Sequence, residues 1–295
     1  MKGTVLNMKL SKLFKEGRPT LSFEVFPPKT SDTYKSVESA IIEIAKLSPD
    51  YMSVTYGAAG TTAGYTLAIA SQLYKEYNVS SLAHITCVGS DKENIKAKLD
   101  DLAAAGIENI LALRGDLPEG MTEIGNDKYK YASELVAVIK EKGNFCIGGA
   151  CYPEGHPESH SSKDDIIHLK EKVDAGCDFL TTQMFFDNNI LYSYLYRIRE
   201  AGITVPVVAG IMPVTNAKQL QRIRKLSGTQ IPKNFIDIVD RFGDDSEKMK
   251  QAGIIYAASQ VVDLWANGVN AVHIYTMNKP DVAAKIKESV SLLMR

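Results

Sequence analysis

Short apolar runs alternate along the chain with longer segments in which apolar residues recur every three or four positions. The runs are typical of buried strands and the longer segments of amphipathic helices. Glycine or proline closes most of them, since neither residue continues regular structure well. The pattern predicts eight strand–helix units, with strands over residues 22–26, 51–56, 82–88, 109–114, 145–152, 179–186, 205–212 and 271–277.

Helices are predicted after each strand, and a leading helix over residues 7–16 precedes the first. The others cover 31–47, 62–77, 91–105, 131–142, 162–175, 188–201, a segment from 216, and 280–293. Only the interval between strands seven and eight is long, and it holds two extra helices, 232–242 and 245–267. Strands that alternate with helices indicate a parallel sheet.

Eight such units in about 270 residues match a closed (β/α)8 TIM barrel in number and length. An open doubly wound sheet is the alternative. However, the first strand leads into Pro27-Pro28-Lys29 and not into a glycine-rich dinucleotide fingerprint. Neither a linker nor a shift in composition divides the sequence, so we expect residues 1–295 to form one barrel domain.

Composition narrows the class of protein. The chain of 295 residues is 45% hydrophobic and 23% charged, with a formal net charge of −1. This balance gives no electrostatic case for nucleic acid or an anionic membrane as partner. No apolar run approaches the roughly 18 residues that span a bilayer, and the Lys-rich N-terminus does not resemble a signal peptide. We expect a cytoplasmic protein with four free thiols, Cys87, Cys146, Cys151 and Cys177.

Polar side chains end nearly every predicted strand. In (β/α)8 barrels the active site lies at the carboxyl ends of the strands, so these side chains are expected to meet there. They are Glu24, Thr55, Tyr56, His84, Arg114, Asp116, Tyr152, Glu154, His156, Gln183, His273 and Tyr275.

Glu24 lies in an apolar strand that stops at a double proline. Burying an unpaired carboxylate is costly, and chains keep one mainly when it is paired or when its shifted pKa is used. We therefore expect Glu24 at the mouth of the barrel, with a pKa raised by burial beside aromatic neighbours such as Phe26. The alternative, a Glu on an edge strand facing water, loses ground because so many other strands end in polar residues.

Arg114, Asp116 and Gln183 are further candidates. Arg114 and Asp116 share strand parity with Ile110, so both are predicted to face one site; a plain Arg–Asp ion pair is the alternative. Gln183 shares parity with Thr181, and its amide suits recognition of an amide-like edge, although a structural role is equally compatible with the sequence.

Other chemistries find less support in the sequence. His156 and His160 have a spacing that suits zinc only on a helix, which Pro157 disfavours, so we expect no metal. No lysine ends a strand, and no nucleophile elbow is present. The acid–base candidates reduce to Glu24 and Asp116, and any hydride transfer would require a cofactor.

Eight segments, in order along the chain, resemble the signatures of the methylenetetrahydrofolate reductase family. They are Phe23-Glu24-Val25-Phe26-Pro27-Pro28-Lys29, Ser53-Val54-Thr55-Tyr56-Gly57-Ala58, His84-Ile85-Thr86-Cys87, Leu113-Arg114-Gly115-Asp116-Leu117-Pro118, Tyr152-Pro153-Glu154-Gly155-His156-Pro157, Lys172-Val173-Asp174-Ala175-Gly176, Thr182-Gln183-Met184-Phe185-Phe186-Asp187 and Gly210-Ile211-Met212-Pro213.

The resemblance, closest to the short bacterial form, implies a barrel that holds FAD without a Rossmann fingerprint. It implies reduction of 5,10-methylenetetrahydrofolate to 5-methyltetrahydrofolate with NADH or NADPH in a homo-oligomer. One cleft that serves both substrates in turn implies ping-pong kinetics. Two alternatives stay open: a pterin-binding barrel enzyme without flavin, such as a methyl transferase, and a non-catalytic flavin- or folate-binding module.

The resemblance also implies roles for individual residues. Glu24 would be the general acid that protonates N10 of the folate, Asp116 the carboxylate near flavin and pterin, and Gln183 an amide that contacts folate and nicotinamide in turn. Gln219, Tyr275 and Lys279 would bind substrate. His168, Glu171 and Lys279 depart from the Asn, Arg and Arg usual in relatives, which removes bidentate phosphate contacts. The implied flavin-site residues are Thr55, Tyr56, Ala58, His84, Arg114, Gly115, Asp116, Tyr131, Ala132, Tyr152, His156, Asp165 and Lys172.

Overall fold

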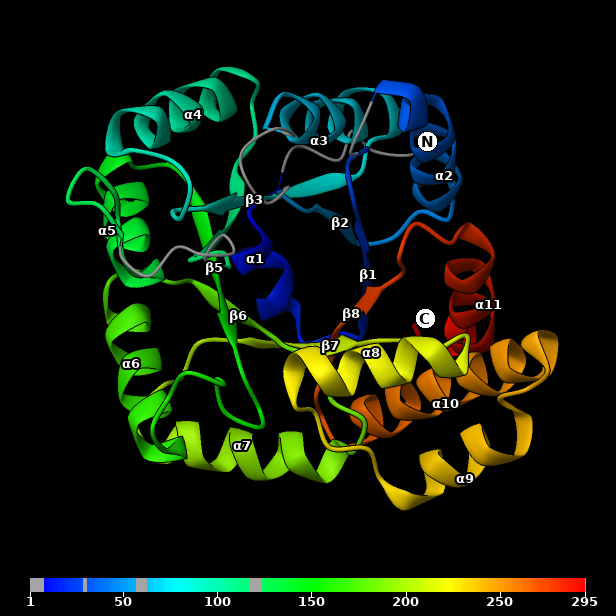
Figure 1. Cartoon of the computed structure of the whole chain (residues 1–295). Helices are drawn as coiled ribbons and strands as arrows, with labels where there is room; N and C mark the ends of the chain where they lie inside the picture. The colour runs from blue at the N-terminus through cyan, green and yellow to red at the C-terminus, as the bar shows by residue number, and fades with distance from the viewer. Residues whose placement is uncertain (1–7, 29–30, 57–62, 117–123, 295) are drawn as a thin grey trace.

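Eight parallel strands form a closed barrel in which each strand pairs with the next and β8 pairs with β1 (Figure 1). The computed structural model describes residues 8–28, 31–56, 63–116 and 124–294. Helices surround the barrel, so the predicted (β/α)8 fold is confirmed and the open sheet is wrong. The strands are β1 (Thr20–Val25), β2 (Tyr51–Val54), β3 (Ser80–Thr86), β4 (Asn109–Leu113), β5 (Cys146–Cys151), β6 (Phe179–Thr182), β7 (Val207–Ile211) and β8 (Ala271–Tyr275).

The helices lie where the apolar periodicity predicts them, including two extra ones between β7 and β8. None within the described residues is long and apolar enough to cross a membrane. They are α1 (Leu10–Leu13), α2 (Tyr34–Lys46), α3 (Ala63–Tyr77), α4 (Lys92–Ala104), α5 (Ala132–Lys142), α6 (Ser162–Asp174), α7 (Asn188–Glu200), α8 (Ala217–Ser227), α9 (Lys233–Phe242), α10 (Ser246–Ala266) and α11 (Pro280–Val290). Three short 3-10 turns, Phe14–Glu16, Ser31–Thr33 and Ser291–Met294, complete the elements.

The predicted strand ends need correction, because several strands stop earlier than their apolar sequence. The largest difference is at β6, which was expected to reach Phe186 and ends at Thr182. Phe185 and Phe186 are fully buried nevertheless, and the Phe186 ring stacks on Phe235 of α9 at 5.4 Å. Residues buried in a loop carry the same apolar pattern as residues in a ladder, so sequence alone does not separate them.

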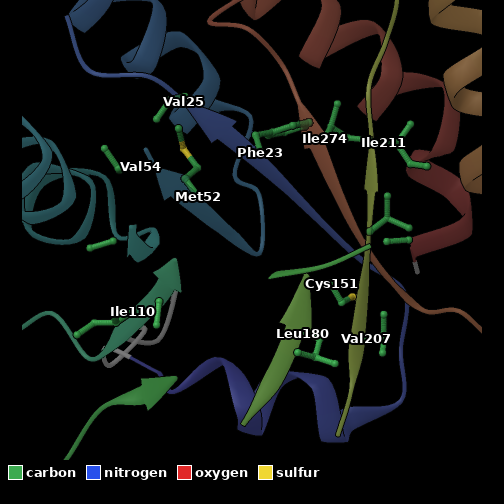
Figure 2. Packing of buried hydrophobic residues seen from close by; sticks show 14 of the residues in the cluster. Phe23, Val25, Met52, Val54, Ile110, Cys151, Leu180, Val207, Ile211 and Ile274 are labelled. Carbon is green, nitrogen blue, oxygen red and sulfur yellow. The ribbon is translucent and has the colours of Figure 1, made fainter. Parts of the chain in front are cut away.

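The outer face of the barrel forms the main apolar layer against the helices. Phe23 and Val25 of β1 lie in this layer with Met52 and Val54 of β2 (Figure 2). Successive side chains of a strand point to opposite faces. Glu24, between Phe23 and Val25, therefore points into the barrel.

Helix α1 closes the amino-terminal end of the barrel. Leu10 and Leu13 pack there against inward-facing residues that include Tyr51 and Phe179 (Figure 1 shows α1 across the barrel). The Leu10 N–H donates to Asn109 Oδ1 at 2.9 Å, which fixes the start of the helix. This apolar floor leaves the carboxyl ends of the strands as the place for a ligand.

Candidate active site

A cavity of about 1330 Å³ lies at the carboxyl ends of the strands. Typical small-molecule pockets measure about 300–1,000 Å³, so this one has room for a large ligand with a second molecule beside it. Ala58 is outside the described residues. The site candidates that line the cavity are Glu24, Thr55, Tyr56, His84, Arg114, Gly115, Asp116, Tyr131, Ala132, Tyr152, His156, Asp165, Lys172, Gln183 and Tyr275.

Glu24 is a buried acid in the wall of this cavity, only 9% exposed. Its Oε2 lies 3.8 Å from Nε2 of His84, which is too far for a hydrogen bond. Burial raises the pKa of Glu24 from 4.5 to about 8. Burial also lowers the pKa of His84 to about 3. At pH 7 the contact therefore joins a neutral carboxylic acid to a neutral imidazole. The expected burial of Glu24 is confirmed, and the alternative of a water-facing Glu24 is wrong.

The buried acid predicts a pH-dependent stability. Because the folded-state pKa of Glu24 lies above its ordinary value, its contribution is fully present below about pH 4.5 and is lost as the pH rises through about 8. Between these values the free energy of unfolding of the wild type should fall relative to Glu24→Gln by up to about 1.4 kcal/mol per pH unit. Urea unfolding of both proteins from pH 5 to pH 9 measures this difference; parallel profiles would contradict it.

A polar layer lies directly beneath Glu24, centred on His273. Ser22 Oγ donates to the carbonyl of Val272 at 3.1 Å, so His273 Nδ1–H donates to Ser22 Oγ at 2.7 Å. His273 Nε2 then accepts from Ser53 Oγ at 2.9 Å, and the imidazole ring stacks on Tyr51. Every proton in this arrangement has an acceptor, so His273 is held neutral. Burial also lowers the pKa of His273 to about 3, so the imidazole is neutral at pH 7.

His273 is predicted at a strand end, whereas it lies one layer inside the barrel, and Ser22 and Ser53 are not among the predicted site residues. Strand parity could have found both serines, since each lies two residues before a site candidate, Glu24 or Thr55, and shares its inward face.

Tyr275 forms the wall beside Glu24, with which it pairs across β8 and β1. Its hydroxyl donates to the carbonyl of Thr182 at 2.5 Å. The ring fits because position 210 is glycine: a Cβ there would lie 2.4 Å from the Tyr275 hydroxyl. Burial raises the pKa of Tyr275, so the phenol stays neutral.

Arg114 and Asp116 both line the cavity, but not for the reason that parity suggested. Ile110 of the same parity faces the outer apolar layer, and β4 has ended before Arg114. The chain turns at Gly115, where φ is +83° and a Cβ would meet the Thr86 side chain at 3.0 Å. The alternative, a plain ion pair with Asp116, is not formed, since the guanidinium pairs with Glu158 instead.

Gln183 lines the cavity, whereas Gln219 and Lys279 are not among its described lining residues. The Oε1 atom of Gln183 accepts from the Met184 N–H at 3.0 Å. Gln219 Oε1 accepts from the Thr215 N–H at 3.1 Å, and Lys279 Nζ donates to Thr215 Oγ1 at 2.6 Å. Both side chains are thus tied to one threonine outside the residues that line the cavity.

Lys172 is a partly buried lysine in the wall of the cavity. Its Nζ donates to the carbonyl of Ala150 at 2.5 Å, and burial lowers its pKa. The thiols of Cys151 and Cys177 lie close by. All four cysteines are free, as expected, and the structure shows that they are buried. Among the described residues, no cluster of His, Cys, Asp and Glu is arranged to hold a metal ion.

Three buried hydroxyl groups in the cavity wall have no hydrogen-bond partner among the residues that the structure describes. They are Thr181 Oγ1 and the hydroxyls of Tyr56 and Tyr194. Buried polar groups are normally paired, so hydroxyls such as these are suited to contact a bound ligand. From the sequence, Thr181 stood out only through its parity with Gln183.

A (β/α)8 barrel with a cavity of this size at the carboxyl ends of its strands, and a buried carboxylic acid in the cavity wall, has the layout of a (β/α)8-barrel enzyme. The family model described as methylenetetrahydrofolate reductase matches residues 9–291. The chain therefore belongs to the methylenetetrahydrofolate reductase family, a family of oxidoreductases.

Curated relatives agree with this assignment. The chain is 37% identical to 5,10-methylenetetrahydrofolate reductase of Pectobacterium carotovorum, over 95% of this chain and 92% of the relative. It is 35% identical to the enzyme of that name in Escherichia coli, over 95% and 93% of the two chains. The methylenetetrahydrofolate reductase (NADH) 1 of Arabidopsis thaliana is 33% identical, with 97% of this chain matching 50% of the plant protein.

Solved structures share the fold at low sequence identity. An uncharacterized Clostridium thermocellum protein that binds two copies of 5-methyl-5,6,7,8-tetrahydrofolic acid superposes with a TM-score of 0.65 at 13% identity, covering 97% of this chain and 99% of that one. Dihydropteroate synthase of Xanthomonas albilineans superposes with a TM-score of 0.51 at 15% identity, covering 93% of this chain and 91% of the synthase.

Proposed function

We propose that this protein reduces 5,10-methylenetetrahydrofolate to 5-methyltetrahydrofolate with NADH or NADPH as electron donor and FAD as bound cofactor. The observation that carries the proposal is Glu24, an acid kept neutral at pH 7 in the wall of a cavity of about 1330 Å³. Membership of the family indicates the substrate. The buried Glu24 can donate the proton that is needed to open the five-membered ring of this substrate.

The residues of the cavity fit a flavin dinucleotide. Thr181 Oγ1 and the Tyr56 hydroxyl offer unpaired hydrogen-bonding groups, and Arg114 and Lys172 offer positive charge for the phosphates. When bound, FAD supplies the hydride transfer that these side chains cannot perform themselves.

In the proposed reaction Glu24 donates its proton to N10 of the folate, which opens the five-membered ring to an iminium. Tyr275, beside Glu24, borders the space in which the substrate lies. Asp116 favours the positive charge that develops on the substrate, and Gln183 contacts the folate and the nicotinamide in turn. Because one cavity serves both substrates, turnover is ping-pong.

A spectroscopic experiment tests the proposal. The purified protein should be yellow, NADH added without oxygen should bleach it, and 5,10-methylenetetrahydrofolate should then restore the colour. Parallel double-reciprocal lines in steady state would support the ping-pong scheme. A colourless protein that binds no flavin would favour a flavin-free pterin-binding enzyme, and a yellow protein that NADH never bleaches would favour a binding module.

A further inference from the structure

The guanidinium of Arg114 is already engaged by a carboxylate of the protein. Nη1 lies 2.5 Å from Oε2 of Glu158 and Nη2 lies 2.6 Å from Oε1. Both side chains line the cavity. Arginine uses this bidentate geometry for carboxylates and phosphates alike. Glu158 therefore occupies two of the five N–H donors of Arg114 and places a negative charge against the cation that a phosphate group in the cavity would use.

The loop between β5 and α6 holds Glu158 in this place. Nδ1 of His156 accepts from the Glu158 N–H at 3.1 Å, and the His156 carbonyl accepts from the Ser159 N–H at 2.9 Å. Ser159 Oγ donates to Oδ1 of Asp165 at 3.1 Å. Hydrogen bonds and an ion pair of this loop thus involve three implied flavin-site residues: Arg114, Asp165 and His156 of the loop itself.

The charges around the cavity make Arg114 important for an anionic ligand. The other Lys or Arg among the described lining residues is Lys172, whose amine donates to the Ala150 carbonyl. The acids in the lining near these two cations are Asp116, Glu158, Asp164, Asp165 and Glu171. Within the described part of the cavity, a phosphate gains most from Arg114, and Glu158 competes with it for that contact.

We propose that Glu158 competes with the phosphate groups of the flavin dinucleotide for Arg114 and thereby sets the affinity of the protein for its cofactor. The inference rests on the proposed function only in taking FAD as the ligand. The exchange is possible because the Glu158 side chain is 57% exposed and the solvent can receive it. Releasing Arg114 from Glu158 should therefore favour flavins that carry phosphate and leave other flavins unaffected.

Glu158→Gln tests this competition, since it keeps the size of the side chain and removes its charge. Titration of the flavin-free full chain by flavin fluorescence should show about threefold to tenfold tighter binding of FAD at low salt. Riboflavin, which has no phosphate, should bind both proteins equally. Added salt should weaken FAD binding more in the variant than in the wild type. In the variant, FAD forms a new ion pair with Arg114, whereas in the wild type it replaces the existing pair with Glu158, so the number of ion pairs stays the same.

The matched control is Glu93→Gln on α4, which removes an exposed carboxylate that pairs with Lys96 away from the cavity lining. Its affinity for FAD should equal that of the wild type. An unchanged FAD affinity in Glu158→Gln would overturn the proposal, and so would an equal gain for riboflavin, which would make Glu158 a steric cover.

Pyrophosphate separates failure of this inference from failure of the proposed function. It should raise the unfolding temperature of Glu158→Gln more than that of the wild type, whether or not any flavin binds. Equal shifts would overturn the competition for Arg114. A larger shift without any flavin binding would retain competition for a phosphate ligand and overturn FAD as that ligand.

Discussion

Glu24→Gln is expected to slow the reduction of methylenetetrahydrofolate by about 10²–10⁴-fold while the reduction of the flavin by NADH keeps its wild-type rate. The amide cannot protonate N10, whereas hydride transfer from NADH needs no proton from this side chain. The fold should persist, because Gln replaces a carboxyl group that is already neutral when buried at pH 7. Stopped-flow spectroscopy without oxygen measures the two half-reactions separately.

Glu93→Gln on the exposed face of α4 is the matched control and should leave both half-reactions unchanged. In the wild type, the folate half-reaction should also decline as the pH rises through about 8, because the acid is then ionised. Equal slowing of both half-reactions in Glu24→Gln would show that Glu24 acts on the structure of the site and is not the general acid.

Gly210→Ala is expected to lower the free energy of unfolding by about 1–3 kcal/mol and to disturb the wall beside Glu24. The added Cβ would lie 2.4 Å from the Thr182 carbonyl oxygen and 2.4 Å from the Tyr275 hydroxyl. The tyrosine has to move, and its 2.5 Å hydrogen bond to Thr182 is lost. Urea unfolding measures the stability, and the rate of the folate half-reaction reports on the wall.

Gly64→Ala is the control for this substitution. Gly64 lies in α3, and a Cβ there would meet nothing within 4 Å. This variant should match the wild type in activity and equal or slightly exceed it in stability, because alanine favours a helix more than glycine does. If Gly210→Ala were as stable as Gly64→Ala, the barrel interior would have room that the structure does not show.

Much of the fold follows from local sequence. The spacing of apolar residues predicts each strand and helix, and eight repeated units specify a barrel because parallel strands with helical connections close at that number. The ends of the strands are less predictable. Phe185 and Phe186 look like strand residues, yet they are buried in a loop because α9 and α10 cover them.

The site, like the fold, has features that the sequence predicts and features that it does not. Strand ends predict that Glu24, Arg114 and Gln183 face one cavity, since carboxyl ends of parallel strands meet at one end of a barrel. The partner of Arg114 is not predictable in this way. Glu158 is 44 residues further along the chain, in a loop whose position depends on contacts with residues distant in sequence.

The sequence by itself determined the order of the elements, the place of Glu24 at the mouth of the barrel and the family, because these depend on local periodicity and short motifs. Only the tertiary structure decided that Glu24 is neutral, that His273 lies beneath it between two serines, and that Glu158 occupies Arg114. The physical reason is that burial and hydrogen-bond partners depend on which strands and loops the closed barrel brings together.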